Sequence, residues 1–411
     1  DQHDHSTALP WFIKALETDL EDPDRVAIHR LRIATTMDRC PKLVDVWETP
    51  NATRVSDCHA DGRTFLLGSH RQRSLWKIGD GKDQLPIDLQ GFLAVSRDGT
   101  RILIERNGEV KVVDSQTGEV RTELETSGGS VKLATFNADG KRVAIGYLDQ
   151  RVRVWDAESG EAITKMLDEQ IRELGAVALS PHGRYLAATD KHGLILVWNL
   201  AVDAPAKRVE TRVFSGSQEK QLVVSDSYAA VPVRTYVTVV DLNTGERAYP
   251  KLKHADGVES LRLSPNGKLL LSSSSDHTAR VWEMTTGEPI VDGIQHGSSV
   301  KEVEFSFDGT MIVTGTTGGE VSTWSTKTGK RIHPTLRHAD HITDVSFSRD
   351  GRYLLTSSVD AGTRVWDLVA ADSVPYMRRD GRGAMFGCEF SQESDRDLLF
   401  VTSLWERQHY A

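Results

Sequence analysis

A period of 42 residues runs through the second half of this 411-residue chain and constrains its fold more than any other feature. Three successive segments end in a tryptophan 42 residues after the last: SSSSDHTARVW at Trp282, TGTTGGEVSTW at Trp324 and TSSVDAGTRVW at Trp366. With gaps of 37 to 43 residues, the same position is held upstream by Trp76, Val113, Trp155, Trp198 and Val240. Such a period predicts a repeat architecture, in which each unit buries its apolar surface against its neighbours.

Within each unit the pattern predicts short β-strands. Alternating runs such as RVRVW, LILVW and ARVWE are separated by Asp-Gly, Thr-Gly and Ser-Gly turns, which is typical of hairpins. In the sixth unit we expect strands at 248–252, 258–264, 269–274 and 279–283. Because one such sheet cannot cover both of its apolar faces, we expect the sheets to stack around an axis.

Composition limits the classes of partner and compartment. The chain has 50 basic and 59 acidic side chains, well mixed, which argues against a nucleic-acid-binding surface. It has no apolar run long enough to span a membrane, so no membrane association is expected. Its three cysteines, Cys40, Cys58 and Cys388, form no CxxC pair, which favours a reducing, cytoplasmic compartment. Since the chain begins without Met, we expect it to be a piece of a longer protein.

Two regions differ in texture. Residues 1–41 predict a short N-terminal helical hairpin, because Leu9, Phe12 and Leu16 share one face and Pro41 ends the second helix. The hairpin is expected to pack on the neighbouring repeats, and partner binding is the alternative. Residues 42–411 predict the repeat array, with eight repeats and a partial ninth that begins at FGCEFSQESDRDLLFVTS.

Four polar or aromatic positions recur within the repeats. In the sixth and eighth units the sets are His254, Ser272, Asp276 and Trp282, and His338, Thr356, Asp360 and Trp366. The seventh unit keeps His296 and Trp324 but has Gly318 in place of the Asp. A buried Trp N–H needs an acceptor, and a hydroxyl, a neutral imidazole and a carboxylate can complete a hydrogen-bonded chain. His, Ser and Asp also resemble hydrolase parts, but a catalytic site would not recur with the strand period.

These sets resemble those of the WD-repeat β-propeller family, and the resemblance covers nearly all of residues 43–411. It implies an all-β propeller with four-stranded blades, seven or eight in the ring, closed by pairing strands from the two ends of the chain. We expect the segment at 42–47 to be the outer strand of the closing blade. Seven blades would pair it with 321–325 and leave the rest to start a second ring; eight would pair it with 363–367. A nine-bladed ring and an open arc are further alternatives.

The resemblance also implies a non-catalytic protein–protein interaction scaffold that needs no metal or cofactor. Partners would contact loop residues just after the repeat His and just before the repeat Asp, which differ in type between units. These candidates are Lys132, Leu148, Glu259, Ser275, Lys301, Thr317, His341 and Thr343.

Two further hypotheses concern catalysis and context. The alternative to a scaffold is a propeller-based hydrolase or lyase, which would need acid and base side chains from different repeats converging at the channel mouth. The segment before the repeats also resembles the WD-repeat regions of planctomycete-type bacterial proteins, many of which carry an upstream Ser/Thr kinase domain. That likeness implies a part in a larger bacterial signalling or regulatory protein.

Overall fold

The computed structural model describes most of the repeat array. The described ranges are 40–48, 54–58, 64–68, 73–78, 81–82, 91–126, 129–168, 171–202, 205–210, 221–250, 252–360, 362–369, 388–391 and 398–401, with eight separate residues between Trp11 and Arg32. Most of the proposed helical hairpin lies outside these residues. The eight that are described are helical, but the segments that would join them are not among them, so the hairpin stays a prediction.

The first four sheets follow one another in chain order, and each is antiparallel. Sheet 1 consists of β2 (Arg54–Cys58), β3 (Thr64–Gly68), β4 (Arg73–Lys77) and β5 (Gly81–Lys82). Sheet 2 consists of β6 (Phe92–Val95), β7 (Arg101–Arg106), β8 (Glu109–Asp114) and β9 (Val120–Leu124). Sheet 3 consists of β10 (Val131–Phe136), β11 (Arg142–Tyr147) and β12 (Val152–Asp156). Sheet 4 consists of β13 (Leu174–Leu179), β14 (Tyr185–Asp190), β15 (Leu194–Asn199) and β16 (Lys207–Glu210).

The remaining sheets repeat this plan, and the last one includes a strand from the start of the chain. Sheet 5 consists of β17 (Val223–Val224), β18 (Tyr228–Val233), β19 (Tyr236–Asp241) and β20 (Leu252–Lys253). Sheet 6 consists of β21 (Val258–Leu263), β22 (Leu269–Ser274), β23 (Thr278–Glu283) and β24 (Pro289–Gln295). Sheet 7 consists of β25 (Val300–Phe305), β26 (Met311–Thr316), β27 (Glu320–Ser325) and β28 (Leu336–Arg337). Sheet 8 consists of β29 (Ile342–Phe347), β30 (Tyr353–Ser358), β31 (Gly362–Asp367) and β1 (Lys42–Glu48). A separate hairpin pairs β32 (Cys388–Ser391) with β33 (Leu398–Val401).

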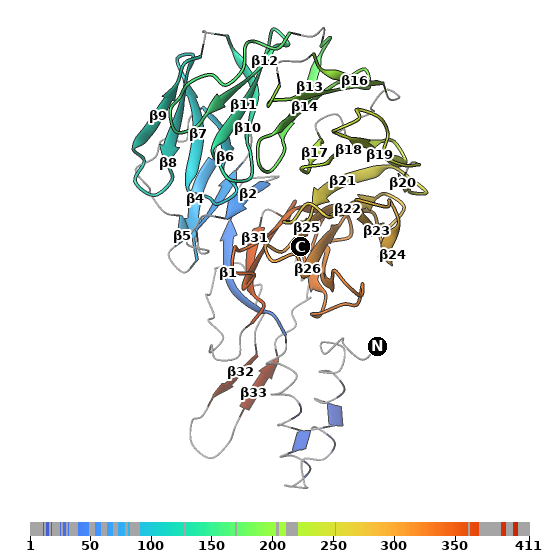
Figure 1. Ribbon diagram of the computed structural model, residues 1–411. Helices are drawn as coiled ribbons and strands as arrows, with labels where there is room; N and C mark the ends of the chain where they lie inside the picture. The colour runs from blue at the N-terminus through green and yellow to red at the C-terminus, as the bar shows by residue number, and fades with distance from the viewer. Residues whose placement is uncertain are drawn as a thin grey trace, which may run out of the picture.

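The sheets are arranged around a common axis in an all-β, propeller-like fold (Figure 1). Their first strands line that axis, because β21 contacts β25, β25 contacts β29 and β29 contacts β2. The sequence unit is offset from the sheet. The strand expected at 248–252 is wrong in its bounds, because the strand there is the short β20 (Leu252–Lys253), which belongs to sheet 5. The other three strands expected in the sixth unit lie in sheet 6.

Strand β1 lies beside β31, although more than 300 residues separate them in the sequence (Figure 1). The register pairs Leu43 with Trp366 and Val46 with Arg364. The expected seven-blade closure, in which 42–47 pairs with 321–325, is therefore wrong, as is the start of a second ring near residue 331. Residues 321–325 lie in β27, whose neighbours are β26 and β28. The physical reason is that the outer edge of β27 is already paired with β28. The outer edge of β31 has no other partner strand among the described residues, so β1 pairs there.

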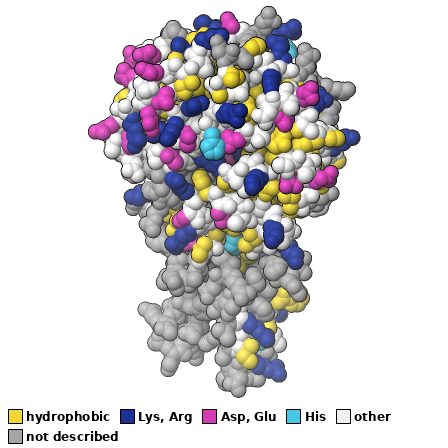
Figure 2. Space-filling view, in the orientation of Figure 1, with side chains coloured by type: hydrophobic (Ala, Val, Ile, Leu, Met, Phe, Trp, Pro, Cys, Tyr) yellow, Lys and Arg dark blue, Asp and Glu magenta, His cyan; other side chains and the backbone are white. Residues whose placement is uncertain are grey.

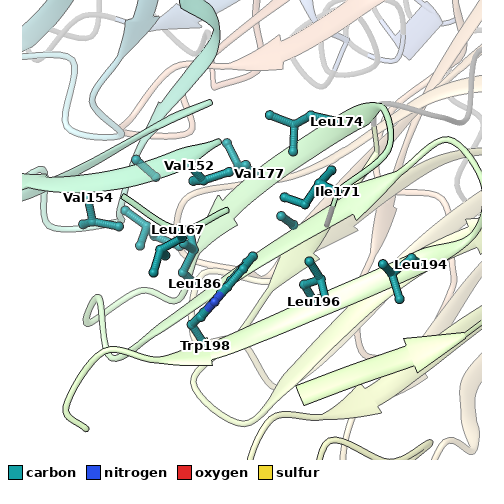
Figure 3. Packing of buried hydrophobic residues seen from close by; sticks show 13 residues of the cluster. Val152, Val154, Leu167, Ile171, Leu174, Val177, Leu186, Leu194, Leu196 and Trp198 are labelled. Atoms are coloured by element: carbon teal, nitrogen blue, oxygen red, sulfur yellow. The ribbon is translucent and has the colours of Figure 1, made fainter. Parts of the chain in front are cut away.

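The core is divided among the interfaces between neighbouring sheets. Figure 3 shows one such cluster, in which Val152 and Val154 of sheet 3 pack against Leu186 and Trp198 of sheet 4. A comparable cluster joins sheets 8 and 1, where Trp47 of β1 has its ring centroid 5.5 Å from that of Trp76. Each sheet thus covers the apolar face of the next, which a single sheet could not do alone.

Candidate functional site

The hydrogen-bonded sets lie inside sheets 6 and 8. In sheet 6, Trp282 Nε1 donates to Ser272 Oγ over 2.9 Å, and Ser272 Oγ lies 2.8 Å from His254 Nε2. His254 Nδ1 lies 3.1 Å from Asp276 Oδ2, which also accepts the Ala255 N–H at 2.8 Å. The hydroxyl both donates and accepts, so each member of the set is satisfied.

Sheet 8 contains the same chain of bonds. Thr356 Oγ1 accepts from Trp366 Nε1 over 3.0 Å and lies 2.7 Å from His338 Nε2. His338 Nδ1 lies 3.1 Å from Asp360 Oδ2. Both histidine side chains are fully buried. The sets therefore hold strands of one sheet together and offer no accessible nucleophile.

The aspartates in these sets are held ionised. Burial alone would raise the pKa of Asp276, but hydrogen bonds from Thr278 and the Ala255 N–H, together with His254, lower it to about 2. The pKa of Asp360 is lowered for the same reasons, with Arg364 as an additional positive neighbour. A carboxylate that accepts several hydrogen bonds is stabilised in its charged form.

Sheet 7 has an incomplete set. Trp324 Nε1 donates to Thr314 Oγ1 over 2.9 Å. The Thr314 hydroxyl donates to the Ser322 carbonyl oxygen over 3.3 Å instead of to a histidine. His296 Nε2 is buried without a hydrogen-bond partner. Gly318 supplies no carboxylate, and its N–H donates to Ser298 Oγ.

The partner-binding candidates fall on one end of the sheets, which we name the loop face. It comprises the loops between the second and third strands and the loops that lead into the first strands. Backbone bonds tie the two kinds of loop together: Leu148 N–H donates to Ser130 O, Ser275 N–H to Gly257 O and Thr317 N–H to Ser299 O, over 2.8 to 3.0 Å. Because the N–H groups of these residues already have acceptors within the chain, we expect a partner to contact their side chains rather than their backbone N–H groups.

Four of the candidates occupy the same structural position. Lys132, Glu259, Lys301 and Thr343 are each the second residue of a first strand, where the register shifts at a β-bulge. A bulge leaves one residue outside the regular pairing and re-aims its side chain. The repeat therefore places a side chain of variable type at the same bend in four sheets.

Three candidates are in mutual contact. Lys301 Nζ lies 2.8 Å from Glu259 Oε1, and Ser275 Oγ donates to the same carboxylate oxygen. Ser299 Oγ is 3.3 Å from Ser275 Oγ. We name Glu259, Ser275, Ser299 and Lys301 the loop-face cluster; it joins sheets 6 and 7. Sequence reasoning identified three of its members but not Ser299, whose place just before a first strand was the available signal.

The other candidates do not join this cluster. Leu148 is 57% exposed, and His341 is exposed with its imidazole on the Asp340 carboxylate. Thr317 and Thr343 are half-buried.

A charged group on the first strands was missed by sequence reasoning. Arg262 of β21 and Glu302 of β25 approach to 3.6 Å, and Glu304 Oε2 accepts the N–H of Phe347. Asp344 of β29 lies among them, and its pKa is raised by burial and then by Glu302 and Glu304, against the effect of Arg262. The 42-residue spacing from Glu302 to Asp344 was the signal in the sequence.

Across the described residues, no three His, Cys, Asp or Glu side chains are placed to hold a metal ion. Acidic and basic side chains are interspersed over the face seen in Figure 2. Of the helical residues that are described, none belongs to a stretch long and apolar enough to cross a membrane.

Comparison with known families and structures agrees with this geometry. Segments 118–156, 249–283, 287–325 and 329–367 match the family model "WD domain, G-beta repeat". They correspond to the third, sixth, seventh and eighth units. The chain is thus an all-β, propeller-like protein that carries WD40 repeats. The fold and the four repeat matches together support its place among WD-repeat proteins.

The curated relatives include one protein that is named for its WD repeats. The chain is 29% identical over 151 residues to the WD repeat-containing protein SL1-17 of Schistosoma mansoni, covering 36% of this chain and 49% of that protein. It is 30% identical over 187 residues to autophagy-related protein 16 of Arabidopsis thaliana, covering 40% and 36%. Similarity to striatin-4 of Homo sapiens, 26% over 169 residues, covers 39% and 22%. The chain therefore spans less than half the length of each of these relatives.

Solved structures resemble the chain in fold. The computationally designed Ika8 protein superposes with a TM-score of 0.61 at 19% identity, covering 79% of this chain and 99% of that one. The C-terminal WD40 domain of Sif2 gives 0.60 at 14% identity, covering 80% and 98%. At these identities the likeness concerns the fold alone.

Proposed function

We propose that the chain is a non-catalytic scaffold that binds protein partners through its loop face. The observation that carries this proposal is the loop-face cluster, in which bulges of successive first strands present a glutamate and a lysine beside two hydroxyl groups. A rigid, repeated frame with side chains that vary at one position is suited to specific recognition. Similarity to the relative named WD repeat-containing protein SL1-17 and the four WD-repeat matches support the same class of function.

The frame of this proposal is a ring of eight blades. The pairing of β1 with β31 and the packing of β2 against β29 support closure between sheets 8 and 1. A closed ring has no long exposed sheet edge at the seam and holds the loops of neighbouring blades in a fixed relation. Binding by this frame involves no cofactor, nucleic acid or membrane.

The wider context remains a prediction. The resemblance of the segment before the repeats to planctomycete-type proteins favours a larger bacterial signalling or regulatory protein in the cytoplasm. That protein would carry a kinase domain upstream in the same polypeptide. The coding sequence that flanks this chain tests it directly.

The scaffold proposal is tested by charge reversal on the loop face. We would capture partners from an extract of the native cells, purify the main one and measure its affinity for Lys301→Glu and Lys327→Glu. Lys327 is exposed in the turn at the opposite end of β27 and is the matched control. We expect Lys301→Glu to weaken binding at least tenfold, about 1.4 kcal/mol, and Lys327→Glu to leave it unchanged. Equal effects of the two variants would contradict the loop-face assignment.

The enzyme alternative rests on one specific observation, the group formed by Arg262, Glu302, Glu304 and Asp344. Carboxyl groups that are close together can have separated pKa values, as acid–base catalysis requires. A hydrolytic turnover that survives purification and is lost in Asp344→Asn would replace the scaffold proposal by a catalytic one.

A further inference from the structure

The complete sets in sheets 6 and 8 show where a carboxylate binds in this repeat. Asp276 Oδ2 accepts from His254 Nδ1 and from the N–H of the next residue, Ala255. Asp360 Oδ2 accepts from His338 Nδ1 and from the Ala339 N–H over 3.1 Å. In both sheets one carboxylate oxygen therefore bridges an imidazole and the following backbone N–H.

Sheet 7 retains both donors at this position without the carboxylate. The equivalent donors, one period away, are the His296 imidazole and the Gly297 N–H, and the equivalent of the aspartate is Gly318. His296 is half-buried, whereas His254 and His338 are each only 7% exposed. Gly297 and Gly318 are exposed, and a Cβ at Gly297 would have no heavy atom within 4 Å. The Ser298 hydroxyl thus lies against Gly318, while the space over Gly297 is open; we name the surface formed by His296, Gly297, Ser298 and Gly318 the sheet 7 notch.

The surroundings of the notch favour an anion. Burial, and then the positive charges of Arg331 and His277, lower the pKa of His296 to about 4. An anion in the notch would be attracted by those charges, and it would restore the acceptor that the imidazole has lost. Ser298 lines the notch and uses its Oγ to accept the Gly318 N–H, which leaves the hydroxyl proton available to an anion.

We propose that the sheet 7 notch binds the carboxylate of an aspartate or glutamate side chain from a protein partner. The partner's side chain takes the place that Asp276 and Asp360 occupy in their own sheets, accepting hydrogen bonds from His296 and the Gly297 N–H. We assign the carboxylate to a protein side chain rather than to a free small anion, because the notch lies on the loop face that is proposed to bind proteins. His296 N–H donates to His277 O, and the adjoining Ser299 contacts Ser275 of the loop-face cluster. This inference rests on the proposed function and specifies the chemistry of the partner.

The proposal is tested on the full chain with a small carboxylate peptide. Histidine would be labelled with 15N, and the ring signals of His296 would be assigned from His296→Gln among the 14 histidines. The probes are acetyl-Gly-Asp-Gly-amide and its Asn counterpart. We expect the Asp peptide to shift the His296 signals saturably and to bind at least tenfold more tightly than the Asn peptide, with the His254 and His338 signals unmoved.

Variants separate the notch from the rest of the loop face. Gly318→Asp supplies the carboxylate within the chain, so the response to the Asp peptide should fall at least tenfold. Because a Cβ at Gly318 would lie 2.8 Å from Ser298 Oγ, the double variant Gly318→Asp with Ser298→Ala is examined as well. Lys301→Glu should leave the peptide response unchanged even if it abolishes binding of the protein partner, so the two proposals fail separately.

Three results would overturn the inference. They are an unresponsive His296, an equal response to the Asn peptide, and a full response in both Gly318→Asp variants.

Discussion

At the scale of single residues, the repeated set of side chains is complete in two sheets and incomplete in a third. In sheets 6 and 8 the set is complete and buried, and it satisfies a Trp N–H in the interior of the sheet. In sheet 7 Gly318 supplies no carboxylate, and His296 is half-buried rather than buried. The recurrence of the set with the strand period predicted a structural role, and the burial of both histidines in sheets 6 and 8 agrees with that role.

Removing the carboxylate of a complete set should destabilise the fold. Asp276→Ala leaves the Ala255 and Thr278 N–H groups without their acceptor and removes the nearer acceptor of His254 Nδ1, at a cost on the order of 1–3 kcal/mol. Trp282→Ala should cost more, about 3–5 kcal/mol, because it leaves a cavity. Urea unfolding measures both. The control is Asp149→Ala, at the equivalent position of the third unit, where Asp149 is exposed and pairs with Arg151. A loss in the control equal to that of Asp276→Ala would contradict this explanation.

Asp344 should make stability fall as pH rises. Its pKa is raised in the folded chain, by burial and then by Glu302 and Glu304, against Arg262. Its favourable contribution is therefore complete below the unfolded pKa of about 4 and is lost as pH rises through the higher folded pKa. Asp344→Asn keeps an acceptor for the Val345 N–H and removes the charge. Urea unfolding should show it more stable than the parent near pH 7 and similar near pH 4; the reverse order would show that the assigned pKa direction is wrong.

At the scale of strands and sheets, the decisive contact is that between β1 and β31. It completes sheet 8 with a strand from the opposite end of the described array and brings Trp47 onto Phe65 and Trp76 of sheet 1. Closure thus depends on a backbone register and on one buried aromatic side chain.

Neighbouring residues of β1 should differ sharply in their effect on stability. Trp47 is 2% exposed in the seam between sheets 8 and 1, whereas Val46 is 46% exposed on the other side of the strand. Trp47→Ala should cost about 3–5 kcal/mol by cavity formation, and Val46→Ala less than about 0.5 kcal/mol. Thermal or urea unfolding distinguishes the two, and equal losses would argue against a packed seam.

Much of the fold followed from the spacing of residues, and the remainder depended on packing between distant segments. The phased tryptophans and turn glycines predicted three strands of sheet 6 and, with the family resemblance, the membership of 42–47 in the closing sheet. They did not decide which sheet that was, because β27 and β31 have similar sequences, EVSTW and GTRVW, and only the structure shows that the outer edge of β27 is already paired with β28. The match between β1 and its partner depends on the number of sheets that the ring accommodates.

The partner-binding role of the eight candidate residues stays a prediction. Three of them form the loop-face cluster together with Ser299. The bulges that place Lys132, Glu259, Lys301 and Thr343 were not expected, because a bulge depends on the pairing register rather than on one strand's sequence. Asp344 and its acidic neighbours were missed for a similar reason, since strands from three sheets must meet before their charges interact.

At the scale of the whole molecule, a stiff frame carries its variable side chains at one end. Neighbouring sheets share a core, as sheets 3 and 4 do in Figure 3, so the loops above them keep a fixed relation. The loop-face cluster and the sheet 7 notch both lie between sheets 6 and 7, and together they offer a charged pair, hydroxyl groups and an anion-accepting opening. We therefore expect a partner to bind across these two sheets.

The central claim is most directly tested by hydrogen–deuterium exchange of the chain with and without its captured, purified partner. The account predicts slower exchange on binding at 254–259, 275–277, 296–301 and 317–319, and no change in the turns at 284–287 and 326–329 at the opposite end of the same sheets. Protection confined to those opposite turns, with the loop face unchanged, would contradict it.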